Sequence, residues 1–504
     1  MTMLDWAAIG LYVATMLAIG AHYARRSRTQ DDYLLGGRRM NPIGVGLSYF
    51  ATLFSTLTYL GVPGEMVRNG PAVLVQIVAL PLAWFVVSRF VIPIVMRQPV
   101  TTAHEILEAR LGLGVRTLAA TFFLLMRMLW MGLIIQATAT QVLVPVIGLD
   151  PKLAPFVGLL MAVVTVVYTS LGGFKAVVAT DVVQTAILLG GAVLCLGIVT
   201  FDQGGLGWLP DRWLAHWEKP ALGLDLTARR GMLSLVLSVF VWQVCTASSD
   251  QMAVQRYLAT RDAAAASRML ATGFVCNGVV VVLLVLVGAA LLAHSQAHPG
   301  LLGDPAAVAA DADAVFPRFI AQALPTGIRG LVVGGLLAAA MSSLSSGLSA
   351  VAAVVTVDFV ERLGGRRAAD FYGTLPARIL PWAIGLAVVA MGMAVSQVEG
   401  NIFELCNKIV NALTAPLAGM FLMAMFMRRA TVFGVWAGAA AGIATVVAVT
   451  WWPDFTGRPG IGVFWMMPLA LVVQLAIGAA ASLVPLGPPA RPLLTETVTS
   501  GRRG

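Results

Sequence analysis

Charged residues are scarce in this chain, and their scarcity excludes most soluble folds. Only 11% of the 504 residues are Asp, Glu, Lys or Arg, against about 25% in an ordinary soluble domain. Apolar residues (Ala, Val, Ile, Leu, Met, Phe, Trp, Tyr and Cys) make up 59%. So few charges cannot cover the surface of a soluble enzyme of two or three domains, and such high hydrophobicity excludes intrinsic disorder. The composition predicts an all-α polytopic membrane protein.

Cysteine and histidine are also rare, which removes the usual metal and redox motifs. The four cysteines lie in or beside apolar stretches and no CxxC pair occurs, so the sequence predicts neither a redox motif nor a zinc site. We find no metal-ligand spacing among the five histidines. The phosphate-binding pattern GxxxxGK[ST] is absent as well, which argues against ATP-driven chemistry.

Long apolar stretches are abundant, and about 20 mostly apolar residues are enough for a helix to cross a bilayer. We therefore expect about 13 transmembrane helices. They are predicted at residues 5–23, 42–61, 71–95, 117–143, 154–171, 181–201, 232–250, 270–293, 328–356, 378–397, 405–427, 432–452 and 461–485.

The distribution of the 33 Lys and Arg residues predicts the orientation. If the N-terminus lies outside, the cytoplasmic loops hold about twice as many Lys and Arg residues as the outside loops, and Arg256 is counted among the cytoplasmic ones. We expect a multi-pass protein of the plasma (inner) membrane with its N-terminus outside and its C-terminus in the cytoplasm. Residues 1–486 are expected to form a single transmembrane transporter domain with its core at about 42–427, followed by a short cytoplasmic tail at 487–504.

Arg127 is the most conspicuous charge inside an apolar stretch. It stands in TFFLLMRMLWMGLIIQ, with no acidic residue within two helical turns. An ionisable side chain is costly at this depth and indicates a functional site. Because a guanidinium binds a carboxylate through two parallel hydrogen bonds, Arg127 is a candidate clamp for an anion. The alternative is a structural ion pair with an acid on another helix, such as Asp250 or Asp181.

Hydroxyl groups interrupt the apolar stretch at 336–359. Ser342, Ser345 or Ser346, and Ser349 recur at helical spacing and share one helix face. Hydroxyl and carbonyl oxygens suit a small hard cation such as sodium, although small residues also let helices pack closely. The pattern leaves a sodium site and plain helix packing as alternatives.

Three further segments carry polar residues at membrane depth. In LGGFKAVVATDVVQ, Asp181 is either an ion ligand or the N-cap of the span it opens, with Gln184 completing a capping box. The segments FATLFSTLTYLGVPGE at 50–65 and WQVCTASSDQMAVQRY at 242–257 place polar or turn-forming residues inside two spans. Interrupted helices at the starts of two five-helix blocks are typical of inverted-repeat transporters, with ordinary span ends as the alternative.

Three motifs carry a resemblance to a known family. LGGFKAVVATDVVQ at 171–184, DQMAVQRYLATRD at 250–262 and AAAMSSLSSGLSAVAAVVTVDF at 338–359 occur in order and in matching spans. By these motifs the chain resembles the sodium:solute symporter family over residues 5–450, and is similar to its sialic acid and iodide/monocarboxylate branches. The resemblance implies the leucine-transporter-type fold, with inverted five-helix repeats formed by spans 2–6 and 7–11.

The resemblance also implies where ions and solute bind, one sodium ion or two. The first sodium site is expected at main-chain carbonyls and hydroxyls of Ala51, Phe54, Ala339, Ser342 and Ser343. A second sodium site, found in some relatives, is matched by Asp181, Ser345 and Ser346. Contacts to the solute are expected from Ser55, Thr58, Gln76 and Arg127, with the arginine on a carboxylate.

Together these features predict a sodium-coupled symporter, not an enzyme, that imports a small organic solute by alternating access. The expected solute is an organic anion with a carboxylate, of the sialic acid or monocarboxylate type. The alternative is a neutral or zwitterionic solute (an amino acid or a sugar), because Asp250 would neutralise Arg127 if both faced the cavity.

Other classes of protein fit less well. A membrane-embedded enzyme would need paired acids, a histidine cluster or a nucleophile with its base, and we find none in the sequence. A sensor would carry a signalling domain, whereas the predicted tail is short. The expected partners are the solute, sodium and the lipid bilayer, with no nucleic acid and no obligatory protein partner.

Overall fold

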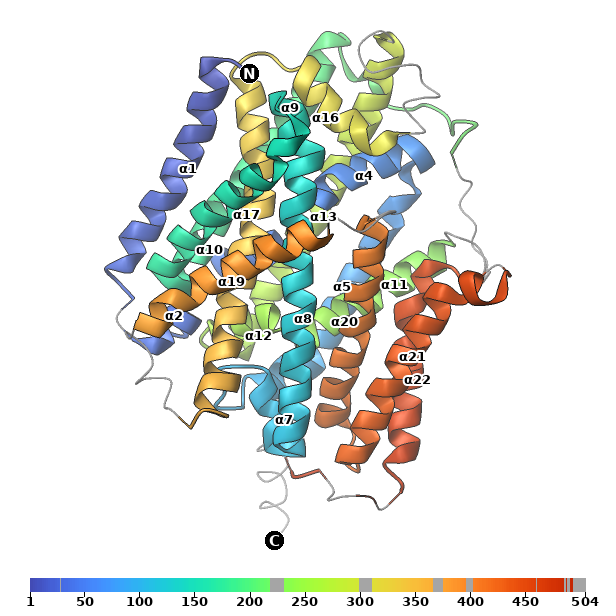
Figure 1. Ribbon diagram of the computed structural model, residues 1–504. Coiled ribbons are helices and arrows are strands. Elements are labelled where there is room, and N and C mark those ends of the chain that lie inside the picture. Colours follow the sequence, from blue (N-terminus) through green and yellow to red (C-terminus); the bar gives the residue numbers. More distant parts are fainter. Residues whose placement is uncertain are drawn as a thin grey trace.

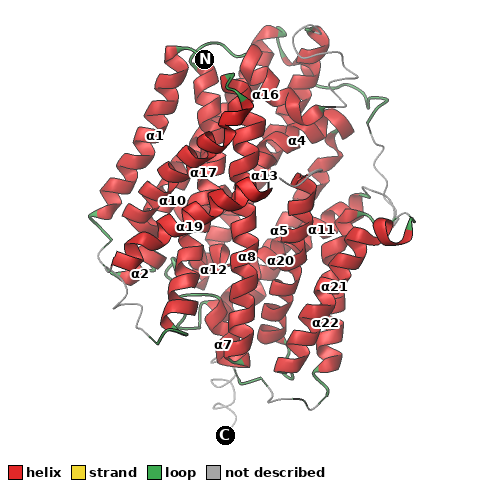
Figure 2. Ribbon diagram, in the orientation of Figure 1, coloured by secondary structure: helices red, strands yellow, loops and turns green. Residues whose placement is uncertain are grey.

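The computed structural model describes residues 1–27, 29–217, 231–298, 311–365, 375–395, 402–458, 460–484, 486 and 490–492. Within these residues every regular element is helical (Figure 2), as the composition predicted. Eight helical stretches are long and apolar enough to cross a membrane, or nine if one bent pair counts as a single span. Helix lies in each predicted apolar range, while the number of crossings and the inverted repeat stay predictions.

The helical elements keep one numbering in the text and in Figure 1. The α-helices are α1 (Met3–Ala24), α2 (Gln30–Leu35), α3 (Pro42–Leu53), α4 (Thr56–Asn69), α5 (Ala79–Val86), α6 (Ile92–Val95), α7 (His104–Leu111), α8 (Leu113–Ala137), α9 (Val144–Ile147), α10 (Ala154–Asp202), α11 (Met232–Ser249), α12 (Gln251–Leu258), α13 (Ala263–Ala297), α16 (Ala312–Gln322), α17 (Ile328–Val354), α19 (Leu375–Val395), α20 (Ile402–Phe426), α21 (Val432–Thr456) and α22 (Met466–Ala481). The 3₁₀ and π segments are η1 (Pro71–Val78), η2 (Val87–Val91), η3 (Thr138–Leu143), η4 (Pro151–Leu153), η5 (Leu206–Trp208), η6 (Val355–Glu361) and η7 (Val463–Trp465).

The centre of the bundle is α17, which packs against α1, α3, α8 and α10. Its most apolar stretch, within residues 328–361, is 89% buried. Helix α1 lies at one edge of the bundle and α21 and α22 at the opposite edge (Figure 1). The serine-rich face that the sequence places on α17 is therefore enclosed by other helices.

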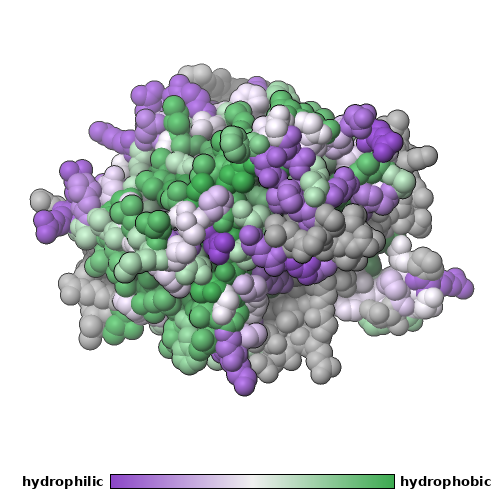
Figure 3. Space-filling view, turned by 90° about the horizontal axis from the view of Figure 1, so that it is seen from above, coloured by the Kyte–Doolittle hydropathy of each residue, from purple (hydrophilic) through white to green (hydrophobic). Residues whose placement is uncertain are grey.

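Large apolar side chains cover much of the outer surface of the bundle. Leu11 on α1, Phe156 on α10 and Val275 on α13 are 70%, 67% and 67% exposed. Seen from above, one end of the molecule carries several patches of polar residues with a broad apolar area beside them (Figure 3). Apolar side chains exposed in such number are unfavourable in water and fit a surface that faces lipid.

One span is broken within its length, at α3–α4, and a second helix, α11, ends where the short helix α12 begins. Helices α3 and α4 meet at a bend of 69°, where Phe54 and Ser55 both have extended backbone. Helices α11 and α12 meet at Asp250, which is also extended and accepts a hydrogen bond from the amide of Met252 at 2.9 Å. Asp250 thus caps α12, and each break frees backbone polar groups inside the bundle.

The predicted stretches 154–171 and 181–201 both lie in α10, which consists of two helical segments that meet at a kink at Gly173. This glycine has φ +62° and ψ −157°, a conformation that residues with a Cβ rarely adopt. A Cβ there would also lie 2.6 Å from the ring of Tyr33. Of the alternatives for Asp181, the N-cap is therefore excluded, because Asp181 lies within the helical segment beyond the kink and not at its start.

Candidate functional site

The break after α3 faces the serine-rich side of α17. The single proton of the Ser342 hydroxyl has two acceptors within reach, the carbonyl oxygens of Ala51, at 2.9 Å, and Ala339, at 3.1 Å. The Ser343 hydroxyl donates to the carbonyl of Thr52 at 3.1 Å. The carbonyls of Ala51 and Thr52 belong to the last turn of α3, which the break leaves without helical partners and which carries the negative end of the helix dipole, whereas that of Ala339 belongs to α17.

The residues expected at the first sodium site are all buried at this junction. Ala51, Phe54, Ala339, Ser342 and Ser343 are each no more than 3% exposed. Phe54 stands directly in the break as the residue that ends α3. The donor set consists of carbonyl and hydroxyl oxygens, the ligands that hard cations prefer, and the hydroxyls can rotate to present their lone pairs.

The residues expected at the second sodium site lie on α10 and on the same stretch of α17. One carboxylate oxygen of Asp181 accepts from the hydroxyls of Ser48, at 2.5 Å, and Ser346, at 3.3 Å. The Ser345 hydroxyl donates to the carbonyl of Ser342 at 3.1 Å. The other oxygen of Asp181 is buried and has no hydrogen-bond partner among the described residues.

Arg256 is part of this second cluster, which the sequence did not reveal. Its guanidinium lies 3.2 Å from Asp181 and donates to the hydroxyl of Ser346 at 2.7 Å. We expected Arg256 in a cytoplasmic loop, but its side chain is fully buried on α12. The error arose because α12 is short and polar and is followed at once by the turn that contains Arg261 and Asp262.

A cavity of about 200 Å³ lies beside the α3–α4 break. Thr58, in the first turn of α4, and Gln76, in η1, are in its wall as the resemblance implied. Ser55 and Arg127 are not among its lining residues. The buried Ser55 stands at the N-cap of α4, and its hydroxyl has no partner in the described part of the chain.

The rest of the cavity wall comes from α3, α5, α11 and α13, far apart in the chain. Tyr49, Gln243 and Asn277 are polar lining residues that the sequence did not single out. The hydroxyl of Tyr49 and the amide oxygen of Gln243 are buried without a hydrogen-bond partner in the described ranges. The sequence could have indicated Asn277 as a site residue, because it is a polar residue in the middle of an apolar stretch.

Arg127 forms the structural ion pair that the sequence left as an alternative. Its guanidinium contacts the carboxylate of Asp250, and the two side chains are only 9% and 3% exposed. Asp250 therefore both caps α12 and neutralises Arg127. The second partner considered for Arg127, Asp181, pairs with Arg256 instead.

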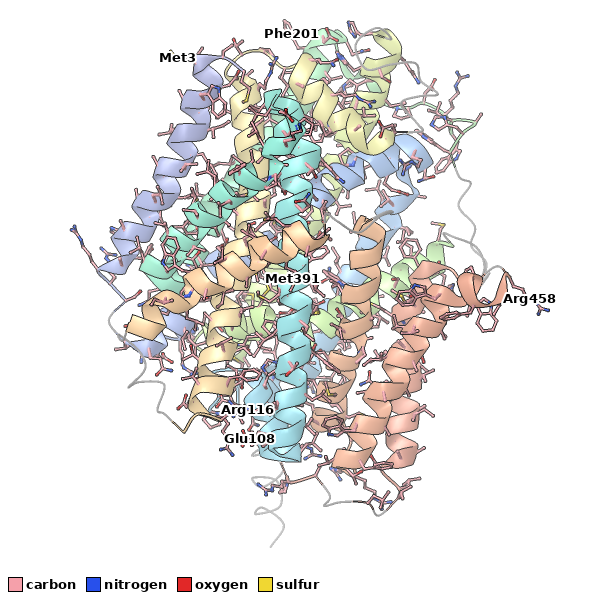
Figure 4. The ribbon with its side chains drawn as sticks, in the orientation of Figure 1. Met3, Glu108, Arg116, Phe201, Met391 and Arg458 are labelled. Atoms are coloured by element: carbon pink, nitrogen blue, oxygen red, sulfur yellow. The ribbon has the colours of Figure 1, made fainter. Side chains whose placement is uncertain are left out.

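A further cluster of buried charged side chains, separate from that of Asp181 and Arg256, lies near Glu108 and Arg116, at the end of the molecule opposite Met3 (Figure 4). Asp358 on η6 accepts from Arg116 at 2.7 Å and lies 3.0 Å from His104 Nδ1. Glu108 on α7 pairs with both Arg116 and Arg362, at 2.6 Å each. This cluster ties η6, after α17, to α7 and α8.

Comparison with known proteins decides the family, since the family model for the sodium:solute symporter family matches residues 33–442. The chain belongs to this family. The sodium/sialic acid symporter SiaT of Proteus mirabilis is 28% identical over 464 residues, which cover 90% of each chain. The human sodium-coupled monocarboxylate transporter 1 is 28% identical over 87% of this chain and 72% of its own length.

The fold of this family member agrees with solved transporter structures. A substrate-bound, outward-open sodium-coupled sialic acid symporter superposes with a TM-score of 0.82 at 23% identity, covering 97% of this chain and 99% of the other. A nucleobase-cation-symport-1 transporter in a closed conformation superposes with a TM-score of 0.60 at 15% identity, covering 90% and 94%. At these identities the likeness establishes the fold alone.

Proposed function

We propose that this protein is a sodium-coupled symporter that imports a small organic anion with a carboxylate by alternating access. Family membership supports sodium-coupled symport, and relatives named for sialic acid and monocarboxylates support the solute class. The observation that carries the proposal is the junction between the broken α3–α4 span and the serines of α17. At this junction Phe54 lies both in the break and in the wall of the cavity of about 200 Å³, so the oxygen cluster and the cavity are neighbours.

The first sodium ion binds where α3 ends against α17. The carbonyls of Ala51, Phe54 and Ala339 and the hydroxyls of Ser342 and Ser343 supply its oxygen ligands. Sodium then takes the place of the hydrogen bonds that Ser342 and Ser343 donate to α3 carbonyls. Both hydroxyls keep their protons and turn their lone pairs to the ion, which holds the two helices together. Each sodium entering with the gradient also gains about 2.3 kcal/mol per 100 mV of membrane potential.

A second sodium ion binds at Asp181, Ser345 and Ser346. The free oxygen of Asp181 supports this, because a buried carboxylate oxygen without a partner is costly unless a cation or proton meets it. Arg256 already supplies one positive charge to the same carboxylate. Entry of the second ion therefore requires Arg256 to share Asp181 with it.

The solute carboxylate is placed at the start of α4. Helix N-termini carry unpaired amide groups and a partial positive charge, and broken transporter helices direct them at anionic groups. The first turn of α4, with Thr58, lines the cavity, and Ser55 makes no side-chain capping bond there. Thr58, Gln76 and Ser55 thus form the polar side of the solute site, and Arg127 joins them only when it leaves Asp250.

A zwitterionic solute is the second candidate. The Arg127–Asp250 pair is buried and has no net charge, so opening it would offer a cation to a carboxylate and a carboxylate to an ammonium group. An amino acid could therefore exchange partners with the pair, whereas a simple anion would leave Asp250 unpaired.

The same proposal includes the number of membrane crossings, the repeats and the orientation of the chain. We place about thirteen helices across the plasma (inner) membrane, with the repeats formed by spans 2–6 and 7–11 in residues 42–427. The N-terminus is outside, and residues 487–504 form a cytoplasmic tail.

A thermal-shift screen of the purified protein, with and without sodium, tests the solute class. Carboxylates, amino acids and sugars are compared at equal concentration. We expect carboxylates to raise the melting temperature only when sodium is present, since a ligand that binds only the folded state stabilises it. Stabilisation by amino acids alone would favour the second candidate, and stabilisation by neutral sugars would contradict both.

A further inference from the structure

Three side chains that commonly bind metals meet at one end of the bundle. Asp202 ends α10, His294 lies in the last turn of α13, and His298 follows that helix. The carboxylate oxygen of Asp202 lies 3.1 Å from His294 Nδ1 and 3.8 Å from His298 Nδ1. One ligand atom from each of the three lies within 4.8 Å of the others.

The expectation that no histidines have metal-ligand spacing is wrong at this point. His294 and His298 are four residues apart, His294 in the last turn of α13 and His298 at the residue that ends it. Their rings lie 4.5 Å apart between centroids. The third group, Asp202, comes from another helix and is remote in the chain, which is why the sequence did not show the cluster.

We propose that Asp202, His294 and His298 form a zinc site. Imidazole and carboxylate groups suit zinc, whereas calcium and magnesium prefer all-oxygen sites. Two ligands of a tetrahedral zinc with bonds near 2.0–2.1 Å stand about 3.3 Å apart. The observed oxygen–nitrogen distances of 3.1 and 3.8 Å lie on either side of this value, so small side-chain rotations complete the site.

The surroundings leave a fourth position for water. Asp202 and His298 side chains are 38% and 46% exposed, whereas that of His294 is 8% exposed. The buried ring of His294 packs edge-on against Phe319, at 5.3 Å between centroids. One ligand is thus held in place by the fold, and the other two remain open to an ion arriving from solution.

An ion pair alone explains only part of the cluster. A histidine near a helix C-terminus is favourable beside a carboxylate and the helix dipole, which accounts for His294 and Asp202. An ion pair does not explain why a second imidazole, that of His298, lies near the same carboxylate, because two charged rings would repel each other. A metal ion binds both rings in their neutral form and replaces the proton between His294 and Asp202.

A zinc ion at this site would join α10 and α13, which contribute to different candidate sites. Phe201, next to Asp202, lies at the same end of the molecule as Met3 (Figure 4), the end that we expect outside the cell. Helix α10 carries Asp181, and α13 contributes Gly273 and Asn277 to the cavity wall. External zinc would tie these helices together and slow transport, a consequence that rests on the proposed function.

Zinc binding to the purified full-length protein tests the site directly. Titration calorimetry should show one zinc ion per chain for the wild type and for the control His22→Ala, which removes an exposed histidine on α1 away from the cluster. His298→Ala and Asp202→Asn change exposed side chains and should weaken binding at least about tenfold, since losing even a second-shell partner costs that much. Absence of zinc binding in the wild type, or unchanged affinity in both variants, would overturn the site.

Uptake into proteoliposomes separates the two proposals. Zinc on the outside should slow sodium-driven uptake by the wild type and leave uptake by His298→Ala unchanged. Equal slowing of both proteins would contradict a cross-link through this cluster. A protein that binds zinc but shows no sodium-driven uptake would overturn the proposed function and leave the zinc site standing.

Discussion

Arg127 and Asp250 form a buried ion pair on which both folding and the proposed solute selectivity would depend. Each charge is largely shielded from water and depends on the other. Removing one partner of such a pair leaves an uncompensated buried charge and costs about 3–5 kcal/mol, whereas apolar replacement of both is often neutral. A lower uptake after a single substitution would therefore not distinguish a loss of folding from a loss of solute recognition.

A double substitution separates these effects. Arg127→Ala should lower the free energy of unfolding by about 3–5 kcal/mol, and Arg127→Met combined with Asp250→Leu should recover part of that loss, since the N-cap of α12 is lost with Asp250. We expect the double variant to fold but to take up carboxylates poorly, as measured by thermal unfolding and proteoliposome uptake. The exposed Arg89→Met is the control, and full carboxylate uptake by the double variant would remove Arg127 from the solute site.

The free oxygen of Asp181 yields a second prediction at this scale. Asp181→Asn keeps the shape of the side chain but removes the negative charge that faces Arg256 and the proposed second ion. Uptake should fall, and the dependence of its rate on sodium concentration should become less steep. The control is Asp150→Asn, an exposed N-cap far from the cluster. An unchanged sodium dependence in Asp181→Asn would leave a single coupled ion.

At the scale of elements, the bend in α10 sets where Asp181 meets α17. Gly173→Ala would force a residue with a Cβ into a backbone conformation that is essentially confined to glycine, which costs about 1–3 kcal/mol. It would also push that Cβ against the ring of Tyr33. We expect a lower melting temperature for Gly173→Ala. Gly190→Ala is the control on the same helix, since its added Cβ meets no atom within 4 Å. Equal melting temperatures of the two variants would contradict this explanation of the bend.

The contact between α7 and η6 gives a pH prediction. Burial alone would raise the pKa of Glu108, but hydrogen bonds from Arg116 and Arg362 hold this pKa below its ordinary value. A carboxyl whose folded-state pKa is depressed adds stability above its unfolded pKa and loses it as the pH falls through the folded value. The melting temperature of wild type should therefore exceed that of Glu108→Gln at neutral pH.

This advantage should shrink as the pH falls below about 5. Glu361→Gln is the control, measured over the same pH range. A wild-type advantage that stays constant down to the lowest pH measured would contradict the role assigned to the ion pairs of Glu108.

At the scale of the whole molecule, the sequence was informative where the signal is local. Apolar runs predicted the helices, and polar residues inside them predicted the breaks and the serine face of α17. The sequence did not reveal Arg256 and Tyr49 as site residues, because their roles depend on helices that are distant in the chain. The same holds for the pairing of Arg127, where the sequence could name Asp250 as a partner but not decide between it and a solute.

The whole-molecule account depends on sodium holding the α3 break against α17. The most direct measurement is solute uptake into proteoliposomes, with and without an inward sodium gradient, by wild type and by the double variant Ser342→Ala, Ser343→Ala. Ser349→Ala on the same helix is the matched control. We predict that wild type and control require sodium and that the double variant loses sodium-driven uptake while remaining folded. Full sodium-driven uptake by the double variant would contradict the central claim.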